Sequence, residues 1–130
     1  MRYLLDTHLL IWVADKDLNA FLPPPARDII EDDTCDVLFS AASIWEIVIK
    51  QALGRPDFRI DPTALRLGAL ASGYQDLPIT SAHTLEVGNL PPLHRDPFDR
   101  VLIAQARSEG LTLLTHDPTV SAYGANTRYV

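Results

Sequence analysis

The sequence predicts an α/β fold in which helices cover both faces of a central, mainly parallel sheet. Short apolar runs alternate with amphipathic helical segments, proline and glycine residues separate them, and no internal repeat or low-complexity tract interrupts the pattern. A chain of 130 residues supports one sizeable core, so a single domain over residues 1–130 is expected. In open sheets of this kind, sites form beyond the carboxyl ends of the strands.

The first half of the chain is expected to contain two strands and three helices. An apolar run ends at Asp6, Pro25 suits the first turn of a helix, and Gly54 suits the end of another. The expected elements are a strand at 2–5, a helix at 7–15, a helix within 22–33, a strand at 37–39 and a helix at 43–54.

The second half repeats the alternation. Gly73 and Gly110 each close an amphipathic segment, and prolines mark the loop between them. The expected elements are a loop at 55–61, a helix at 62–73, a strand within 74–80 that runs into 81–90, a loop at 91–97, a helix at 98–110, a strand at 111–115 and an edge strand at 127–130.

Composition indicates a soluble globular protein, with 47% hydrophobic and 22% charged residues and a mean hydropathy of +0.04. No apolar run approaches the roughly 18 residues of a membrane span. Asp6 and His8 interrupt the N-terminus too early for a signal peptide, so a cytoplasmic protein is expected. The lone Cys35 cannot form an internal disulfide or a thiolate zinc cluster, and a buried apolar role is expected for it.

The net charge of −6, from 11 basic and 17 acidic residues, argues against a coat protein held to nucleic acid by a basic surface. It does not exclude a nuclease, because carboxylates gathered in one cleft contribute to such a total and a bound divalent cation offsets them locally.

Three acidic residues follow predicted strands, and each has a structural explanation. Asp6 could cap the next helix. Glu46 stands three residues after Ser43, the spacing of a capping box, and Lys50 four residues later could pair with it. Asp117 precedes a proline, where an aspartate turn needs no function.

A functional reading is stronger for Glu46. Its helix carries apolar residues at Ile44, Ile47 and Val48 and is expected to be buried nearly all round. A buried carboxylate is costly unless it is paired or bound to metal, so either the ion pair with Lys50 or a metal site is required.

The stretch "HRDPFDR" at 94–100 contains two aspartates with different expected roles. Asp96 before Pro97 is a helix-start signal, which makes Asp96 an N-cap. Asp99 heads the stripe that packs on the sheet, so its carboxylate is expected to point toward the strand ends; a charge–dipole interaction of about 0.3–1 kcal/mol is its structural alternative. The rest of the stripe is Leu102, Ile103 and Ala106.

Four carboxylates that converge on one cleft repel one another unless a cation lies between them. Oxygen ligands favour Mg²⁺ or Mn²⁺, either of which can lower the pKa of a bound water and neutralise charge on a phosphodiester. The acids together therefore indicate metal-dependent hydrolysis.

The segments "YLLDTHLLIW", "SAASIWEIVIK", "HRDPFDRVLIAQA" and "LTLLTHD" resemble, in this order over nearly the whole chain, the PIN-domain ribonucleases, specifically the VapC-like toxins of toxin–antitoxin pairs. The resemblance implies a three-layer α/β/α sandwich and a Mg²⁺- or Mn²⁺-dependent endoribonuclease. It assigns Asp6, Glu46 and Asp99 as the core catalytic, metal-binding acids and Asp117 as a more variable fourth.

The resemblance also implies supporting residues and partners. Hydroxyls that steady the acids or a metal-bound water fall at Thr7, Ser43 and Thr115, and Asp96 belongs to a subfamily version of the motif. A homodimer and an inhibitory antitoxin are implied as partners, with no membrane. Positive side chains that could bind RNA phosphates are Lys50, Arg55, Arg59, Arg95 and Arg100, although solvated surface charge or ion pairing is the better explanation for any single one of them.

Other residues have simpler expected roles. His8, His83, His94 and His116 lack the paired spacing of a zinc site and are not expected to be metal ligands. Trp12, Trp45 and Phe98 could stack on bases, but for the two tryptophans, in predicted packed helices, a core or interface role is favoured.

Three other classes stay open. An aspartate-dependent phosphohydrolase also places an aspartate after the first strand, but usually with a second two residues on, where this chain has His8. A receiver-type signalling domain would need an acidic pair near the start. The non-enzymatic alternative is a protein-binding module of the same fold whose acids only cap helices.

Overall fold

The computed structural model describes residues 1–56 and 58–130, so position 57 of the expected loop at 55–61 lies outside the described residues. Its strands form one sheet in the order β3-β2-β1-β4-β5, and every neighbouring pair is parallel. The prediction of a mainly parallel sheet is confirmed. The strands are β1 (Arg2–Leu5), β2 (Asp36–Ser40), β3 (Gln75–Leu77), β4 (Thr112–Thr115) and β5 (Thr127–Tyr129).

The helices connect the strands as the alternating pattern requires. They are α1 (Thr7–Ala14), α2 (Pro24–Glu31), α3 (Ala41–Ala52), α4 (Pro62–Ala71), α5 (Ser81–Val87), α6 (Pro97–Glu109) and α7 (Pro118–Ser121), with a 3₁₀ turn at Asn19–Phe21. The 3₁₀ turn and α7 were not predicted, because segments of three and four residues are too short to show helical periodicity. Among the described residues, no helix is long and apolar enough to span a membrane.

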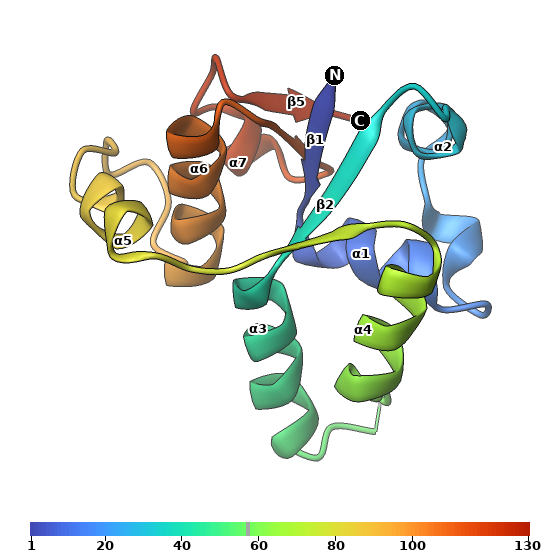
Figure 1. The fold of residues 1–130 in the computed structure, drawn as a ribbon. Coiled ribbons are helices and arrows are strands. Elements are labelled where there is room, and N and C mark those ends of the chain that lie inside the picture. The colour runs from blue at the N-terminus through green and yellow to red at the C-terminus, as the bar shows by residue number, and fades with distance from the viewer. Residues whose placement is uncertain (57) are drawn as a thin grey trace.

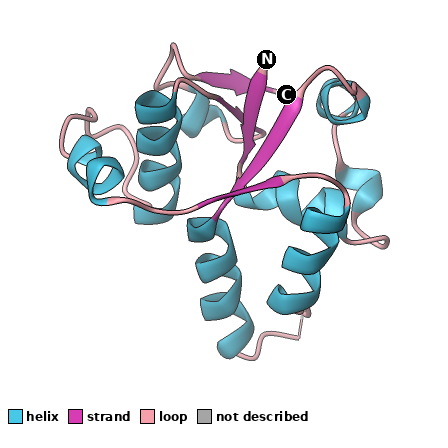
Figure 2. Cartoon of the chain, in the orientation of Figure 1, coloured by secondary structure: helices cyan, strands magenta, loops and turns pink. Residues whose placement is uncertain are grey.

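Side chains that alternate along the strands divide the core into two halves, one on each face of the sheet. In β1, Tyr3 and Leu5 pack on one face with Phe39, while Leu4 packs on the other. The first half is covered by α1, α2 and α4 and the second by α5 and α6, which lie on opposite sides of the strands (Figure 1). These are the three layers that the resemblance implies, with the strands as the middle one (Figure 2). Cys35 is only half-buried, at the edge of the first half.

Helix α6 has defined signals at both ends. Asp96 caps its N-terminus, and Gly110 ends it in the left-handed conformation, with φ of 66°. Glycine adopts this φ at little cost, so the chain turns there directly into β4. The sequence prediction for this helix is confirmed at its start and its end.

Helix α3 differs from its prediction in burial. It extends away from the carboxyl end of β2 (Figure 1), so only part of its surface meets the core. Exposed fractions are 58% for Trp45, 45% for Val48 and 64% for Leu53. The expectation of a helix buried nearly all round is therefore wrong, whereas Glu46 on the inner side is buried.

Candidate active site

The carboxyl edge of the sheet brings the predicted acids into one region. Asp6 directly follows β1, Asp117 follows β4 after one residue, and Glu46 lies on the helix that follows β2. Because β1 lies between β2 and β4, these three elements leave the sheet side by side. The main chain alone therefore places their first residues next to one another.

Asp6 is buried and caps α1. Its carboxylate Oδ1 accepts a hydrogen bond of 2.8 Å from the backbone N–H of Leu9, so the structural explanation for this residue is confirmed. Capping fixes one oxygen of the carboxylate and holds the group at the strand end. Its role as an N-cap is compatible with a metal-binding role for the same carboxylate.

Glu46 is 5% exposed and has an asymmetric environment. Its Oε2 pairs with Nζ of Lys50 at 2.9 Å, which confirms the expected ion pair. Its Oε1 is buried and, within the described part of the chain, has no hydrogen-bond partner. An acceptor of this kind costs free energy unless a group outside the chain binds it.

The capping box proposed for Ser43 and Glu46 is wrong. Helix α3 begins at Ala41, and its cap is Ser40, whose hydroxyl accepts from the backbone N–H of Ala42 at 3.0 Å. Ser43 is thus inside the first turn rather than before it. Glu46 is consequently not explained by capping.

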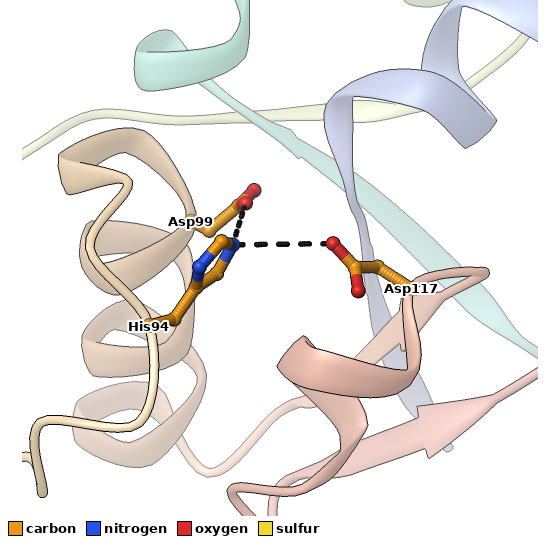
Figure 3. A group of neighbouring side chains, drawn as sticks. All are labelled: His94, Asp99 and Asp117. Carbon is orange, nitrogen blue, oxygen red and sulfur yellow. Dashed lines mark hydrogen bonds and ion pairs between the residues drawn. The ribbon is translucent and has the colours of Figure 1, made fainter.

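A second group of side chains lies beside α6 and α7 (Figure 3). Oδ2 of Asp99 is 2.7 Å from Nε2 of His94, and the same nitrogen is 3.9 Å from Oδ2 of Asp117. One ligand atom from each of the three residues lies within 4.8 Å of the other two. The prediction that Asp99 points toward the strand ends is confirmed, because Asp117 lies just past β4.

His94 is a functional candidate that sequence reasoning excluded. The exclusion relied on the spacing between histidines, yet the neighbours of His94 are carboxylates from two other parts of the chain. Its position five residues before Asp99, in "HRDPFDR", was the only available signal. The contact with Asp117 depends on the fold and could not be read from spacing.

These residues form one electrostatic neighbourhood. Asp6 and Asp117 both line a hollow of about 310 Å³, together with His8, Trp12, His116 and Pro118. The charge of Glu46 acts on Asp99, which in turn approaches Asp117 through His94. All four predicted acids are thus linked, although Asp6 and Glu46 lie outside the tight group of three that the described residues form.

Two of the acids hold protons unusually firmly. Burial raises the pKa of Asp6, an effect that the Leu9 N–H and the Thr115 hydroxyl oppose. Burial and the charge of Asp96 raise the pKa of Asp99 to about 6, and Glu46 adds to the rise while His94 opposes it. Burial is the main cause for both acids, and only at Asp99 do neighbouring negative charges add to it.

The predicted hydroxyl residues contact one another and the acids. Thr7 donates to Ser43 across 3.0 Å, which joins the starts of α1 and α3. Oγ1 of Thr115 accepts from the backbone N–H of Asp117 at 3.0 Å. All three side chains are buried, so these contacts hold the strand ends and helix starts in fixed relative positions.

Asp96 acts as a cap. Its Oδ1 accepts from the backbone N–H of Phe98 at 2.8 Å and from that of Asp99 at 3.4 Å. The cap therefore also fixes the backbone of the neighbouring acid. The expected N-cap role is confirmed.

The candidate RNA-binding cations divide into two classes. Arg100 donates to the carbonyls of Pro91, His94 and Val87 and to the hydroxyl of Tyr123, so its guanidinium holds the 87–94 segment; this argues against a phosphate-binding role. Arg95 is exposed beside His94. Lys50, Arg55 and Arg59 line a cavity of about 470 Å³ that shares His8 and Trp12 with the hollow at Asp6.

The chain matches the family model described as PIN domain over residues 3–126. The chain belongs to the PIN domain family. No protein among the curated ones matches its sequence. Among the acids described above, Asp99 and Asp117 have the imidazole of His94 beside them.

Solved structures share this fold at low sequence identity. A chain of VapBC2 from Rickettsia felis, crystallised bound to a DNA fragment from their promoter, is 13% identical with a TM-score of 0.69, over 99% of this chain and 98% of that one. VapBC-1 from nontypeable Haemophilus influenzae is 18% identical with a TM-score of 0.62, over 100% and 97%. VapBC-5 from Mycobacterium tuberculosis, a member of the VapBC family of toxin–antitoxin systems, is 18% identical with a TM-score of 0.54, over 99% and 97%.

Proposed function

We propose that the chain is a divalent-metal-dependent endoribonuclease. The buried Oε1 of Glu46, which among the described residues has no partner, carries this proposal. The charge of Glu46 acts on Asp99, whose pKa is raised chiefly by burial and then by the charge of Asp96. A Mg²⁺ or Mn²⁺ ion satisfies the oxygen and neutralises the acids at once, so the residues fit such an ion. PIN domains of the VapC type are generally nucleases, which supports the same chemistry.

Different groups of the chain would bind the cation and position the acids that bind it. Asp6, Glu46, Asp99 and Asp117 would hold one or two cations, which lower the pKa of a bound water and neutralise charge on the phosphodiester. The Leu9 N–H orients Asp6, and Thr115 holds the backbone of Asp117. The Thr7–Ser43 contact fixes the helix starts from which the acids project. An attack by water in line with the leaving oxygen needs no covalent enzyme intermediate.

The adjoining cavity supplies a path for the RNA. Arg55 and Arg59 line it beside Trp12, which also lines the hollow at Asp6. Cationic side chains beside an aromatic ring suit a strand whose phosphates are bound and whose bases stack. Lys50, already paired with Glu46, contributes less, and Arg95 is exposed next to His94 in the sequence.

Cleavage of RNA by the purified chain tests this function. Cleavage is expected with Mg²⁺ or Mn²⁺, to stop with a chelator, and to be lost in Asp6→Asn and Asp99→Asn variants that keep the fold by circular dichroism. Asp28→Asn, on exposed α2, is a matched control for a change of charge. A folded wild-type chain that binds no Mn²⁺ and cleaves no RNA would overturn the proposal and favour a protein-binding module of the same fold.

We further propose that this nuclease is the cytoplasmic toxin of a toxin–antitoxin pair and binds a cognate antitoxin. Structures of VapBC systems with the same fold support this role. Exposed apolar side chains on α3, including Trp45 and Val48, offer a surface for a second copy of the chain or for the antitoxin. Co-expression with the product of an adjacent small gene is expected to yield a complex in which RNA cleavage is suppressed; separate elution and unchanged cleavage would contradict it.

A further inference from the structure

We propose that His94 is a ligand of the metal site, and that it gives this chain a preference for Mn²⁺ over Mg²⁺. The inference rests on the proposed metal-dependent function. It adds a nitrogen ligand to a site whose other proposed ligands are all carboxylate oxygens. It follows from where the imidazole lies, what holds it there and what surrounds it.

The spacing of the three atoms matches ligands of a single ion. Around an octahedral ion with bonds of about 2.1 Å, adjacent ligand atoms are about 3 Å apart and opposite ones about 4.2 Å. Nε2 of His94 is 2.7 Å from Oδ2 of Asp99 and 3.9 Å from Oδ2 of Asp117. The same ring nitrogen faces both carboxylates (Figure 3), so a small shift admits an ion among the three atoms.

The backbone on both sides of His94 is fixed. Its N–H donates to the hydroxyl of Tyr123 at 2.8 Å, and its carbonyl accepts from Arg100 at 3.4 Å. Arg100 also donates to the same Tyr123 hydroxyl at 3.2 Å. A loop histidine is thus held in place by two buried or partly buried side chains, as a ligand position requires.

A second observation concerns the buried acid Glu46. The side chain of Glu46 is 93% buried, and its Oε1 accepts no hydrogen bond from any described residue. Its charge acts on Asp99, the acid that His94 contacts. Asp96 adds a further negative charge to the same carboxylate. The single imidazole does not offset this concentration of charge, whereas a divalent ion does.

The imidazole decides which ion is preferred. Mg²⁺ favours oxygen ligands and keeps its waters, while first-row transition ions accept imidazole nitrogen readily. Once the Nε2–H bond to Asp99 is given up and the ring proton lies on Nδ1 instead, the Nε2 lone pair is available to an ion. A site that includes an imidazole ligand therefore favours Mn²⁺ over Mg²⁺ more strongly than a site made of carboxylates alone.

Electron paramagnetic resonance of bound Mn²⁺ tests the assignment directly. In the wild-type chain, spin-echo modulation from a directly bound ¹⁴N nucleus is expected, and it should vanish in His94→Ala. Mn²⁺ affinity in that variant should fall by roughly tenfold or more while Mg²⁺ affinity changes less. His116→Gln removes an imidazole from the hollow that Asp6 and Asp117 line and should leave the nitrogen signal intact.

His94→Asn separates ligation from positioning. An asparagine amide can still donate a hydrogen bond to Asp99 but binds Mn²⁺ poorly, so recovery of wild-type Mn²⁺ affinity in this variant would overturn the proposal. So would bound Mn²⁺ without ¹⁴N modulation in a wild-type chain that cleaves RNA, a result that leaves the nuclease function standing. If Mn²⁺ does not bind at all and RNA is not cleaved, both proposals fail together.

Discussion

Two histidine–carboxylate pairs lie at opposite ends of α6, and nearly equal distances conceal different roles. His83 is 2.8 Å from Glu109, the last residue of the helix, and His94 is 2.7 Å from Asp99 in its first turn. His83 is 1% exposed and its ring is fully engaged. Its Nδ1 accepts from the backbone N–H of Thr80 at 3.0 Å, which leaves Nε2 to donate to Glu109.

The surroundings separate the two pairs. Glu109 is 40% exposed and water can solvate it, and the capping box at Thr80 explains why a histidine stands at His83. Asp99 is close to the carboxylate of Asp117, and the negative charges of Asp96 and Glu46 also act on it. A short distance between a histidine and an acid therefore does not indicate function by itself. Several carboxylates gathered around the pair are the stronger indication.

The largest expected difference between the pairs is in catalysis. Asp99→Asn should lower the rate of RNA cleavage by about a hundredfold or more, because it removes a charge that holds the cation. Glu109→Gln keeps an acceptor for His83 and should change the rate less than about twofold. Single-turnover cleavage with saturating Mn²⁺ measures both. Equal losses in two folded variants would show that the pairs do not differ as proposed.

Stability should show the reverse order. His83→Ala leaves the Thr80 N–H without its acceptor in a buried position and should lower the free energy of unfolding by about 2 kcal/mol. His94→Ala, with a partly exposed ring, should cost well under about 1 kcal/mol. Urea denaturation in the presence of a chelator compares them. A greater loss in the His94 variant would contradict the structural role assigned to His83.

Asp96 sharpens the comparison at the His94 end of α6. Asp96→Ala should destabilise the fold by about 0.5–2 kcal/mol because two helix N–H groups lose their cap. Asp96→Asn keeps the cap, so its stability should stay near that of the wild type, with cleavage retained. If a stably folded Asp96→Asn variant loses as much cleavage as Asp99→Asn, Asp96 is also part of the metal site.

Sequence reasoning reached the fold and the four acids through local patterns. The run ending at Asp6 and the Asp96-Pro97 start signal depend on a few adjacent residues, and both are confirmed. What it missed depends on distant contacts. The Tyr123 hydroxyl accepts hydrogen bonds from Arg100, 23 residues earlier in the chain, and from the backbone of His94, 29 residues earlier. No rule of sequence spacing predicts these contacts.

The burial of α3 was misjudged for a related reason. Apolar residues around a whole helix predict burial, but they also occur where a helix extends from the sheet and exposes one side, as at Trp45 and Val48. The start of the same helix was placed two residues late because Ser40, directly after the predicted strand at 37–39, supplies the cap. Strand ends and caps overlap in sequence, and only the fold separates them.

The smallest expected difference concerns pH. With metal removed, the pKa of Asp99 is raised to about 6 from an ordinary value of 3.8, chiefly by burial and then by the charge of Asp96. The folded chain thus binds this proton more tightly than the unfolded chain. Its stabilising effect is fully present below about pH 4 and is lost as the pH rises through about 6.

Asp99→Asn removes this titration, so its free energy of unfolding should vary less between pH 4 and 7 than that of the wild type. Solvent near a side chain that is 20% exposed screens the effect, which should be on the order of 1 kcal/mol. Asp6, whose pKa burial also raises, acts with the same sign in both proteins and cancels in the difference. Urea denaturation in the presence of a chelator, repeated across this pH range, gives the free energy of unfolding of each protein against pH. Two parallel curves would show that Asp99 is not the carboxyl group with the raised pKa.

Saturating Mn²⁺ should stabilise the wild type more at pH 7 than at pH 5, because protons compete with the cation for the same carboxylate.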